Sequence, residues 1–328
     1  MISFLSKERT VALRGVLALM VLICHLHARV ELFSNSILGT LFTAFGYLAV
    51  SVFFFLSGYG LTESYKKDNL AINNFHKTKI FPFFLICCVA ILIYTIRDLL
   101  CADFDVFVFF QSFFIGKTIV DNGWYLQVQL LLYILFYIAF RFVSKRKLIC
   151  ISLFILGYII ACYLFKLSST WYESIICFAL GVFVSQYRCN FIKMLNKKRA
   201  ILLSVVCLFV LFVITLYFGN KAILGYPIKI IVKIISTVCF TLFVVIIIST
   251  IKIDNFILTF LGKISLEIYI LQGLFLNFYK NVIVISNDWL YILITMISVI
   301  VAAFVAHPVF EKINRIGKVK NKTYKAIK

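Results

Sequence analysis

Charged residues are scarce in this chain. Of its 328 residues, 14% are Asp, Glu, Lys or Arg, whereas typical soluble domains carry about 25%. Hydrophobic residues make up 63%, more than the core of a soluble chain of this length needs. A helix needs about 20 apolar residues to cross a bilayer, so this composition supports about ten crossings with little left over. A soluble fold is therefore excluded, and the sequence predicts an all-α, polytopic integral membrane protein.

Acidic residues are the scarcest charged class, with 13 Asp and Glu against 33 Lys and Arg. The net charge of +20 does not indicate nucleic-acid binding, because the bases fall between apolar runs rather than on one face of a folded domain. Most of the ten cysteines lie inside those runs, where cysteine behaves as a small hydrophobe, so a disulfide-stapled secreted fold is also excluded. The excess of positive charge is interpreted as a signal of membrane topology.

Ten apolar stretches are long enough to span a bilayer. They lie near Val11–Ala28, Gly39–Leu61, Ile80–Ile96, Trp124–Phe142, Leu148–Phe165, Trp171–Tyr187, Ala200–Phe218, Ile228–Ile251, Ile264–Val284 and Trp289–Phe310. The shorter run Phe104–Phe114 is predicted to be interfacial or re-entrant, and a short helix at Phe256–Leu261 to lie on the surface. No internal repeat and no matching pair of broken helices is visible, which disfavours a transporter built from repeats.

An even number of spans places both termini on one side. If that side is the cytoplasm, 25 of the 33 Lys and Arg lie at the inner face and 8 at the outer face, in agreement with the positive-inside rule. Trp124, Trp171 and Trp289 then each begin a span that enters from outside, at the headgroup level that tryptophan prefers. We expect a multi-pass protein of the inner (plasma) membrane with both termini cytoplasmic, a membrane domain over residues 1–316 and a basic cytoplasmic tail over 317–328.

Arg14, His25 and His27 lie within the first span, where charge is costly. Arg14 and His25 are eleven residues apart, which places them about 20° apart around the helix and about 16 Å apart along it. In the simpler interpretation, Arg14 snorkels to the inner headgroups and His25 is a polar packing residue. His27, about 200° around the helix from His25, is interpreted as interfacial.

The second span ends in Phe54-Phe55-Leu56-Ser57-Gly58-Tyr59. Because the chain reaches the inner face here, Ser57 and Gly58 are expected near the depth of Arg14. Gly58 either lets helices pack closely or admits a ligand against bare backbone.

These two spans together resemble the membrane acyltransferase-3 family of bacterial O-acyltransferases. The resemblance rests on Arg14-Gly15-Val16-Leu17-Ala18-Leu19 followed by His25, on Phe54-Phe55-Leu56-Ser57-Gly58-Tyr59, on Trp124-Tyr125-Leu126 and on Leu261-Gly262-Lys263-Ile264-Ser265-Leu266-Glu267-Ile268-Tyr269. It runs from about residue 8 to about residue 310 and includes the ten-span layout.

Two positions depart from the family pattern. Pro82 is preceded by Lys79 and His76, where the family often has a pair of basic residues. Gln272 stands where many members carry histidine, and an amide cannot serve as an acid or a base. This departure leaves His25 as the expected proton carrier within the membrane.

The resemblance implies transfer of an acyl group, usually acetyl, from cytoplasmic acetyl-CoA to a hydroxyl of a cell-surface or lipid-linked glycan. Acetyl-CoA is then the donor substrate and the glycan the acceptor, and no permanently bound cofactor, metal or nucleic acid is expected. The expected donor-binding residues are Arg14, Ser57, Gly58, Tyr59, Lys77 and Lys79, and the expected supporting residues are Phe54, Phe55, Trp124 and Glu267. Arginine suits this role because its guanidinium presents paired donors to phosphate.

His25 is the expected general base on the acceptor hydroxyl, because the unperturbed pKa of histidine, about 6.5, lies near working pH. An acyl-enzyme on Ser57 is the competing route. It requires a broken second span, since Ser57 is placed near the inner end and His25 in the outer half.

Glu267 has two interpretations. It either pairs with Lys263 one turn earlier, at the inner interface, or organises Arg14 at the inner mouth of the site. His76, His307 and Glu311 are interpreted as ordinary interfacial residues.

Two other classes of function stay open. A polyprenol-linked sugar transporter or polymerase would also be polytopic, although large outer loops or inverted repeats are expected of it. A membrane anchor or sensor without chemistry is the third class. The sequence also leaves open the acceptor sugar and the oligomeric state, including a dimer.

Overall fold

The fold is helical throughout the part that a computed structural model describes, which is residues 4–31, 33, 36–220, 225–251, 253 and 255–326. Within these residues, eight helices are long and apolar enough to cross a membrane, and two bent helix pairs bring the number to ten if each pair is one span. The prediction of an all-α, polytopic membrane protein is confirmed.

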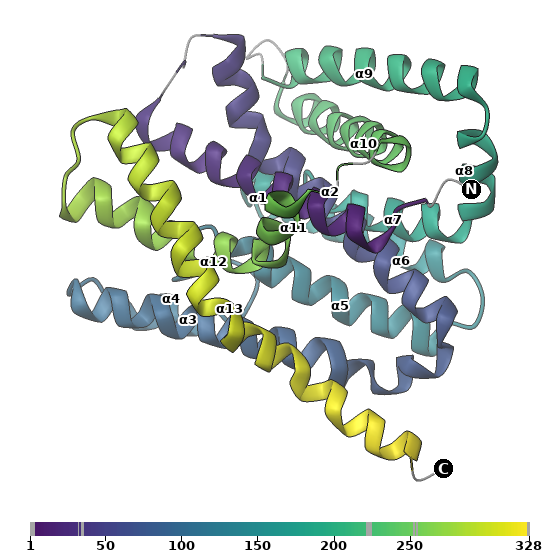
Figure 1. Ribbon diagram of the computed structural model, residues 1–328, viewed down its shortest axis with the longest axis horizontal. Helices are drawn as coiled ribbons and strands as arrows, with labels where there is room; N and C mark the ends of the chain where they lie inside the picture. Colours follow the sequence, from purple (N-terminus) through teal and green to yellow (C-terminus); the bar gives the residue numbers. More distant parts are fainter. Residues whose placement is uncertain are drawn as a thin grey trace. The chain divides into compact units, whose positions relative to one another are not determined.

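Two compact units make up the chain, and each combines two separate segments. Unit 1 comprises residues 1–67 and 151–265. Its helices are α1 (Lys7–Val30), α2 (Ile37–Lys67), most of α6 (Lys147–Leu164), η3 (Ser169–Trp171), α7 (Ile176–Gln186), α8 (Arg188–Leu195), α9 (Lys198–Asn220), α10 (Tyr226–Thr250) and α11 (Phe256–Lys263). In this unit α9 and α10 lie side by side (Figure 1), and α2 packs on both α1 and α7.

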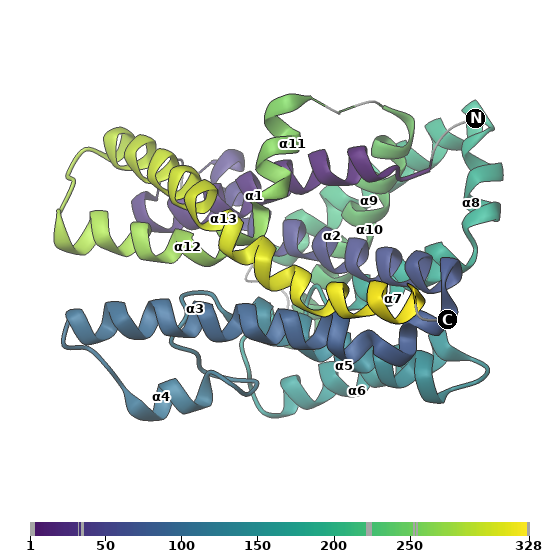
Figure 2. The same ribbon diagram turned by 60° about the horizontal axis from the view of Figure 1, so that its bottom comes forward.

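Unit 2 comprises residues 68–150 and 266–328. Its helices are η1 (Asn69–Asn74), η2 (His76–Ile80), α3 (Phe81–Leu100), α4 (Val106–Gln111), α5 (Trp124–Phe142), α12 (Ser265–Asn277), η4 (Phe278–Val282) and α13 (Asp288–Ala326). In Figure 2, α13 passes over α3, and the two helices are in contact. Helix α3 also packs against α5. The predicted domain boundary at residue 316 lies within α13 and stays a prediction; residues 327 and 328 lie outside the described residues.

Glycines bring helix backbones into contact at two crossings in unit 1. A Cβ atom on Gly58 of α2 would collide with the carbonyl oxygen of Phe178 in α7, and one on Gly181 would collide with that of Phe55. In the same way, Gly15 of α1 faces the backbone of α11. Small residues allow such close approach between membrane helices, where the lipid supplies no hydrophobic drive for association.

Two sharp bends were not apparent from the sequence. The chain turns by 80° between α7 and α8, and by 72° between α11 and α12. The residues at the bends are Tyr187, at φ −99° and ψ 23°, and Ile264, at φ −98° and ψ 14°. Any residue type can adopt these values, so neither proline nor glycine marks the bends. No matching pair of broken helices is visible in the sequence, whereas the structure has two bent helix pairs.

Short helices flank the long ones. The run Phe104–Phe114 forms the six-residue α4, which is too short to span a bilayer. Asp105 caps it by accepting hydrogen bonds from the backbone N–H groups of Phe107 and Val108, at 2.8 and 3.2 Å.

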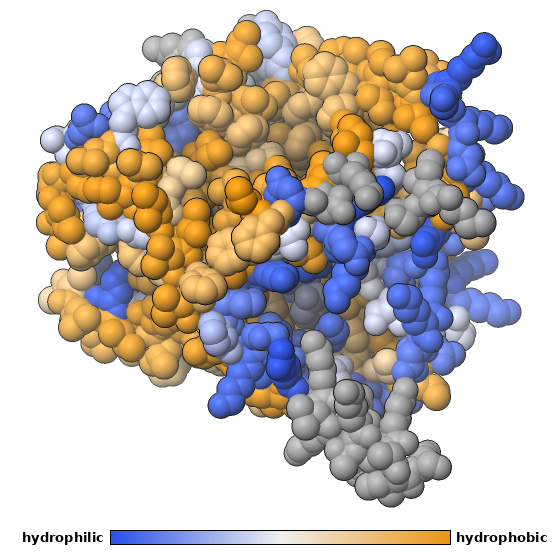
Figure 3. Space-filling model, viewed as in Figure 1, coloured by the Kyte–Doolittle hydropathy of each residue, from blue (hydrophilic) through white to orange (hydrophobic). Residues whose placement is uncertain are grey.

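Large apolar side chains lie on the surface, as expected for helices in contact with lipid. In α9 only 6% of the most apolar 18-residue stretch is buried. The exposed side chains of this helix include Leu202, Leu203 and Phe209, each about half exposed or more. Figure 3 shows this apolar surface over the region of α9. An apolar surface of this kind is expected of a protein that crosses the membrane several times.

We expect Gly58→Leu to destabilise the protein, because the new side chain would push α2 away from α7. Overpacking of this kind costs about 1–3 kcal/mol or more. Gly60→Leu is the matched control, since nothing lies within 4 Å of its Cβ position on the same helix. Thermal unfolding in detergent measures the difference in stability. Equal melting temperatures of the two variants would contradict the close contact between α2 and α7.

Candidate functional site

Arg14 and His25 lie on the uninterrupted helix α1. The helix keeps them on one stripe, about 16 Å apart along its axis. Ala18 and Val21 share this stripe and are buried, with 4% and 3% of their surface exposed. Arg14 is exposed, His25 is half-buried, and neither has a hydrogen-bond or ion-pair partner among the residues described. One stripe therefore carries an unpaired cation at one end and an unpaired imidazole at the other.

Two other arginines of unit 1, Arg9 and Arg188, are committed to the fold. Arg9, one turn before Arg14, donates to the carbonyl oxygens of Ile248 and Ser249 at the end of α10, at 3.3 and 2.9 Å. Arg188 lies 2.7 Å from a carboxylate oxygen of Glu63. The guanidinium groups of Arg9 and Arg188 already have partners within the protein. Arg14 is therefore better suited than either to bind an external anion.

The α1–α2 hairpin fixes the level of Ser57 relative to His25. The Cys24 thiol donates to the Thr43 carbonyl oxygen at 3.5 Å, and a Cβ on Gly46 would lie 2.9 Å from its sulfur. Eleven residues separate Gly46 from Ser57 on the continuous helix α2, a rise of about 16 Å. Ser57 therefore lies near the level of Arg14, and the break in α2 that an acyl-enzyme on Ser57 requires is absent.

The aromatic residues beside Ser57 form packed core. Phe54 and Phe55 are fully buried, and Tyr59 is 6% exposed and stacks on Phe55 with ring centroids 6.1 Å apart. Gly58 is in contact with the backbone of α7. Helix packing thus accounts for Gly58, which was the first of its two interpretations.

Lys77 and Lys79 lie on η2, a π-helical turn that leads into α3. Lys77 is exposed and Lys79 is half-buried. π-Helical turns within helices are frequent at functional sites. Both lysines belong to unit 2 and Arg14 belongs to unit 1, so a joint phosphate site of the three stays a prediction.

Glu267 pairs with His307, which contradicts the interfacial interpretation of that histidine. The His307 Nδ1 atom lies 2.7 Å from Glu267 Oε1, and Glu267 is only 3% exposed. The expected pairing with Lys263 fails because the chain bends by 72° between α11 and α12. The two residues do not share a continuous helix, and four-residue pairing depends on one.

Two segments that carry the family resemblance meet in unit 2. The rings of Tyr125, next to Trp124, and Tyr269 are 5.0 Å apart in an edge-on contact. The Tyr269 hydroxyl also donates to the carbonyl oxygen of Asn122. Trp124 begins α5, and this contact fixes the start of that helix against α12.

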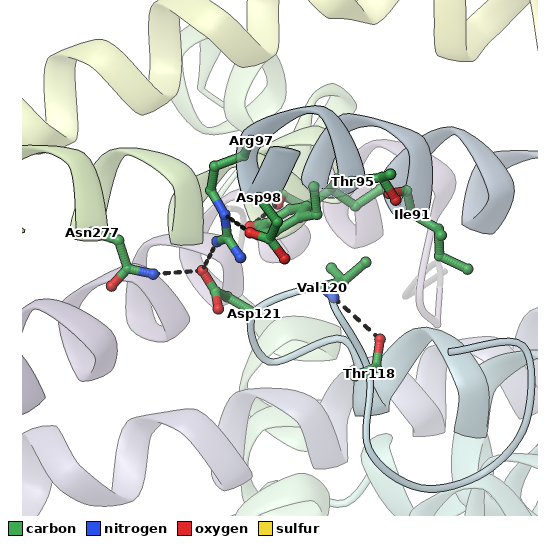
Figure 4. A network of polar contacts seen from close by, with 10 residues as sticks. Ile91, Thr95, Arg97, Asp98, Thr118, Val120, Asp121 and Asn277 are labelled. Atoms are coloured by element: carbon green, nitrogen blue, oxygen red, sulfur yellow. Dashed lines mark hydrogen bonds and ion pairs between the residues drawn. The ribbon is translucent and has the colours of Figure 1, made fainter. Parts of the chain in front are cut away.

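A polar network in unit 2 was missed by the sequence reasoning (Figure 4). The Arg97 guanidinium donates to Asp98 and to Asp121, both at 2.6 Å. The amide of Asn277 donates to the same Asp121 oxygen at 2.6 Å. The sequence offered one signal for this network. Basic and acidic residues are nearly equal in number in the segments assigned to the outer face, and charges that cancel at one face indicate ion pairs.

A buried ion pair in unit 1 was also missed. Lys233 lies 3.1 Å from a carboxylate oxygen of Glu173, which is 1% exposed and also accepts from the Ser169 hydroxyl at 2.9 Å. The Lys233 ammonium stands 5.2 Å from the centre of the Tyr47 ring. A satisfied pair of this kind holds the turn before α7 against α10, although removing one partner would leave a costly buried charge.

The arrangement as a whole offers an anion-binding group, a titratable imidazole and no cluster of three or more potential metal ligands within the described residues. No curated protein and no solved structure matches the chain. A family described as an acyltransferase domain matches residues 12–307, which is nearly the whole chain and includes all four stretches quoted above. The chain belongs to this membrane acyltransferase-3 family and is a multi-pass membrane acyltransferase.

Proposed function

We propose that the protein is an O-acetyltransferase that moves an acetyl group from cytoplasmic acetyl-CoA to a hydroxyl of a cell-surface or lipid-linked glycan. The observation that carries the proposal is the stripe on α1, with Arg14 at one end and His25 at the other, neither of which has a hydrogen-bond or ion-pair partner within the described part of the chain. Acetyl-CoA has a polyanionic nucleotide and a long, thin arm that ends in the thioester. A cation and a base separated by about 16 Å match these two ends.

In the proposed donor site, Arg14 binds a CoA phosphate through paired N–H donors. Lys77 and Lys79 add positive charge, and Ser57 lies near the level of Arg14 at the inner end of the site. The arm follows α1 from Arg14 toward His25, so that the thioester reaches His25. Glu267 supports the inner end through its pair with His307.

In the proposed reaction, His25 removes the proton from the acceptor hydroxyl as its oxygen attacks the thioester carbonyl. The carbon–sulfur bond of the tetrahedral intermediate then breaks, and the CoA sulfur leaves with the electron pair. The proton on the imidazolium passes to that sulfur, which completes transfer and restores the neutral base. Direct transfer is favoured over an acyl-enzyme because α2 is continuous at Ser57.

A transporter of polyprenol-linked sugars is the weaker alternative. The two bends resemble the broken helices of many transporters, but family membership favours acyl transfer. Consumption of acetyl-CoA by the purified protein in the presence of glycan separates the two functions.

We expect His25→Ala to lower acetyl transfer by about 10²-fold or more, the usual contribution of a general base. His27→Ala is the matched control, because that residue lies on the same helix about 200° around its axis and packs edge-on against Phe42. Transfer of radiolabelled acetyl is measured at equal protein levels. Substantial residual turnover in His25→Ala would remove His25 from the catalytic role.

We expect Arg14→Ala to raise the KM for acetyl-CoA by roughly 10-fold or more, since a charged hydrogen bond contributes about 1.5–3 kcal/mol. Arg29→Ala, at the other end of α1 and also exposed, is the matched control. The difference between Arg14→Ala and wild type should vanish with acetyl-pantetheine, which lacks the nucleotide phosphates. A defect of equal size with both donors would show that Arg14 acts elsewhere.

A further inference from the structure

A cavity of about 840 Å³ lies in unit 2 at the end of α3. Its polar lining comes from three places: the end of α3, the loops on either side of α4, and the end of α12 with η4. The polar residues are Arg97, Asp98, Asp103, Asp121, Asn277 and Asn281. The volume falls within the range of about 300–1,000 Å³ that is usual for small-molecule sites.

The network of Figure 4 forms part of the cavity wall and leaves hydrogen-bonding groups unused. A guanidinium has five N–H donors, and Arg97 uses two of them in bonds to Asp98 and Asp121. Asp121 accepts both of its side-chain bonds through one oxygen. The wall therefore presents donors and acceptors side by side, which is what a hydroxyl group needs because it both donates and accepts.

Charge in the lining selects against anions. Three aspartates face one arginine, so a polyphosphate such as the nucleotide of CoA would meet net repulsion. No group of three or more metal ligands occurs in the described part of the chain. Phe275 and Phe278 supply apolar lining that suits the C–H faces of a sugar ring. The preferred ligand class is a neutral, hydroxyl-rich molecule.

The cavity lies at the end of α3 opposite Lys77 and Lys79. Twenty residues separate Lys77 from Arg97, a rise of about 30 Å, which is the thickness of the hydrocarbon core. The charge bias of the sequence assigns the lysine end to the cytoplasm. The cavity therefore belongs to the outer face, where a surface glycan is found.

We propose that this cavity binds the glycan acceptor of the reaction, an assignment that rests on the proposed function. Arg97 and Asn277 hold the Asp121 carboxylate in place, and the unused groups of this network bind sugar hydroxyls. Asn281, which is exposed on η4, adds a further amide.

Cys101 offers a probe that does not depend on turnover, because it lines the cavity and is exposed. In intact cells, a membrane-impermeant maleimide should label Cys101, and Cys101→Ser should remove that label. On the purified full chain in detergent, surface glycan isolated from cells that lack this protein should slow the labelling of Cys101 several-fold. The exposed Cys189 in α8 is the internal reference, and polyethylene glycol at equal mass concentration, which lacks sugar hydroxyls, controls for crowding.

An unchanged rate at Cys101, at glycan concentrations that saturate turnover, would overturn the proposal, as would labelling of Cys101 only in opened cells. If the wild-type protein consumes no acetyl-CoA with this glycan, the proposed function itself fails. If it does, and only the protection is missing, the acetyltransferase stands and the acceptor cavity does not.

A kinetic test uses Asn281→Leu, which fills part of the cavity and removes an amide. The KM for the glycan should rise by about tenfold, the loss of one to two hydrogen bonds, whereas the KM for acetyl-CoA should not follow it. Asn190→Leu, at an exposed asparagine of α8, is the matched control. Equal KM values for the glycan in Asn281→Leu and in wild type would overturn the proposal.

Discussion

Close contact between helix backbones is the constraint on which unit 1 depends. In a bilayer, lipid tails are as apolar as leucine, so helices associate through packing and polar contacts rather than through a hydrophobic drive. Gly58 and Gly181 let α2 meet α7, and Gly15 lets α1 meet α11. Helix α1 is held by α2 at Cys24 and by α11 at Gly15. The positions of Arg14 and His25 along the helix axis therefore follow from helix packing and not from contacts of their own side chains.

Most strongly charged groups inside this protein are paired, and the pairs stabilise its helix contacts. Glu173 with Lys233 joins the turn before α7 to α10, and Glu267 with His307 joins α12 to α13. An unpaired charge would carry a large desolvation cost in such places. Arg14 is the contrast, because it has no partner among the described residues and is exposed. It avoids that cost through exposure, and exposure is also what an anion-binding group requires.

The sequence predicts the helical class, the span layout and the α1 stripe, because all three depend on periodicity and length along one continuous helix. It could not predict the bends at Tyr187 and Ile264, whose backbone angles are open to any residue. It also missed the partner of Glu267, since the bend removes Lys263 from the same helix. Contacts such as Arg97 with Asp121 depend on which loops meet, and no local pattern specifies that.

The two ends of α3 differ in charge, and this difference bears on the two proposed substrates. Lys77 and Lys79 lie on the turn that precedes the helix, whereas Arg97 at the far end pairs with Asp98 and Asp121. Long-range Coulomb attraction draws a polyanion to the first end and not to the second. A neutral sugar does not respond to this field and is held by short hydrogen bonds, which depend on the shape and donors of the cavity. In the proposed function, the charges at the two ends of α3 therefore direct the donor to one end and the acceptor to the other.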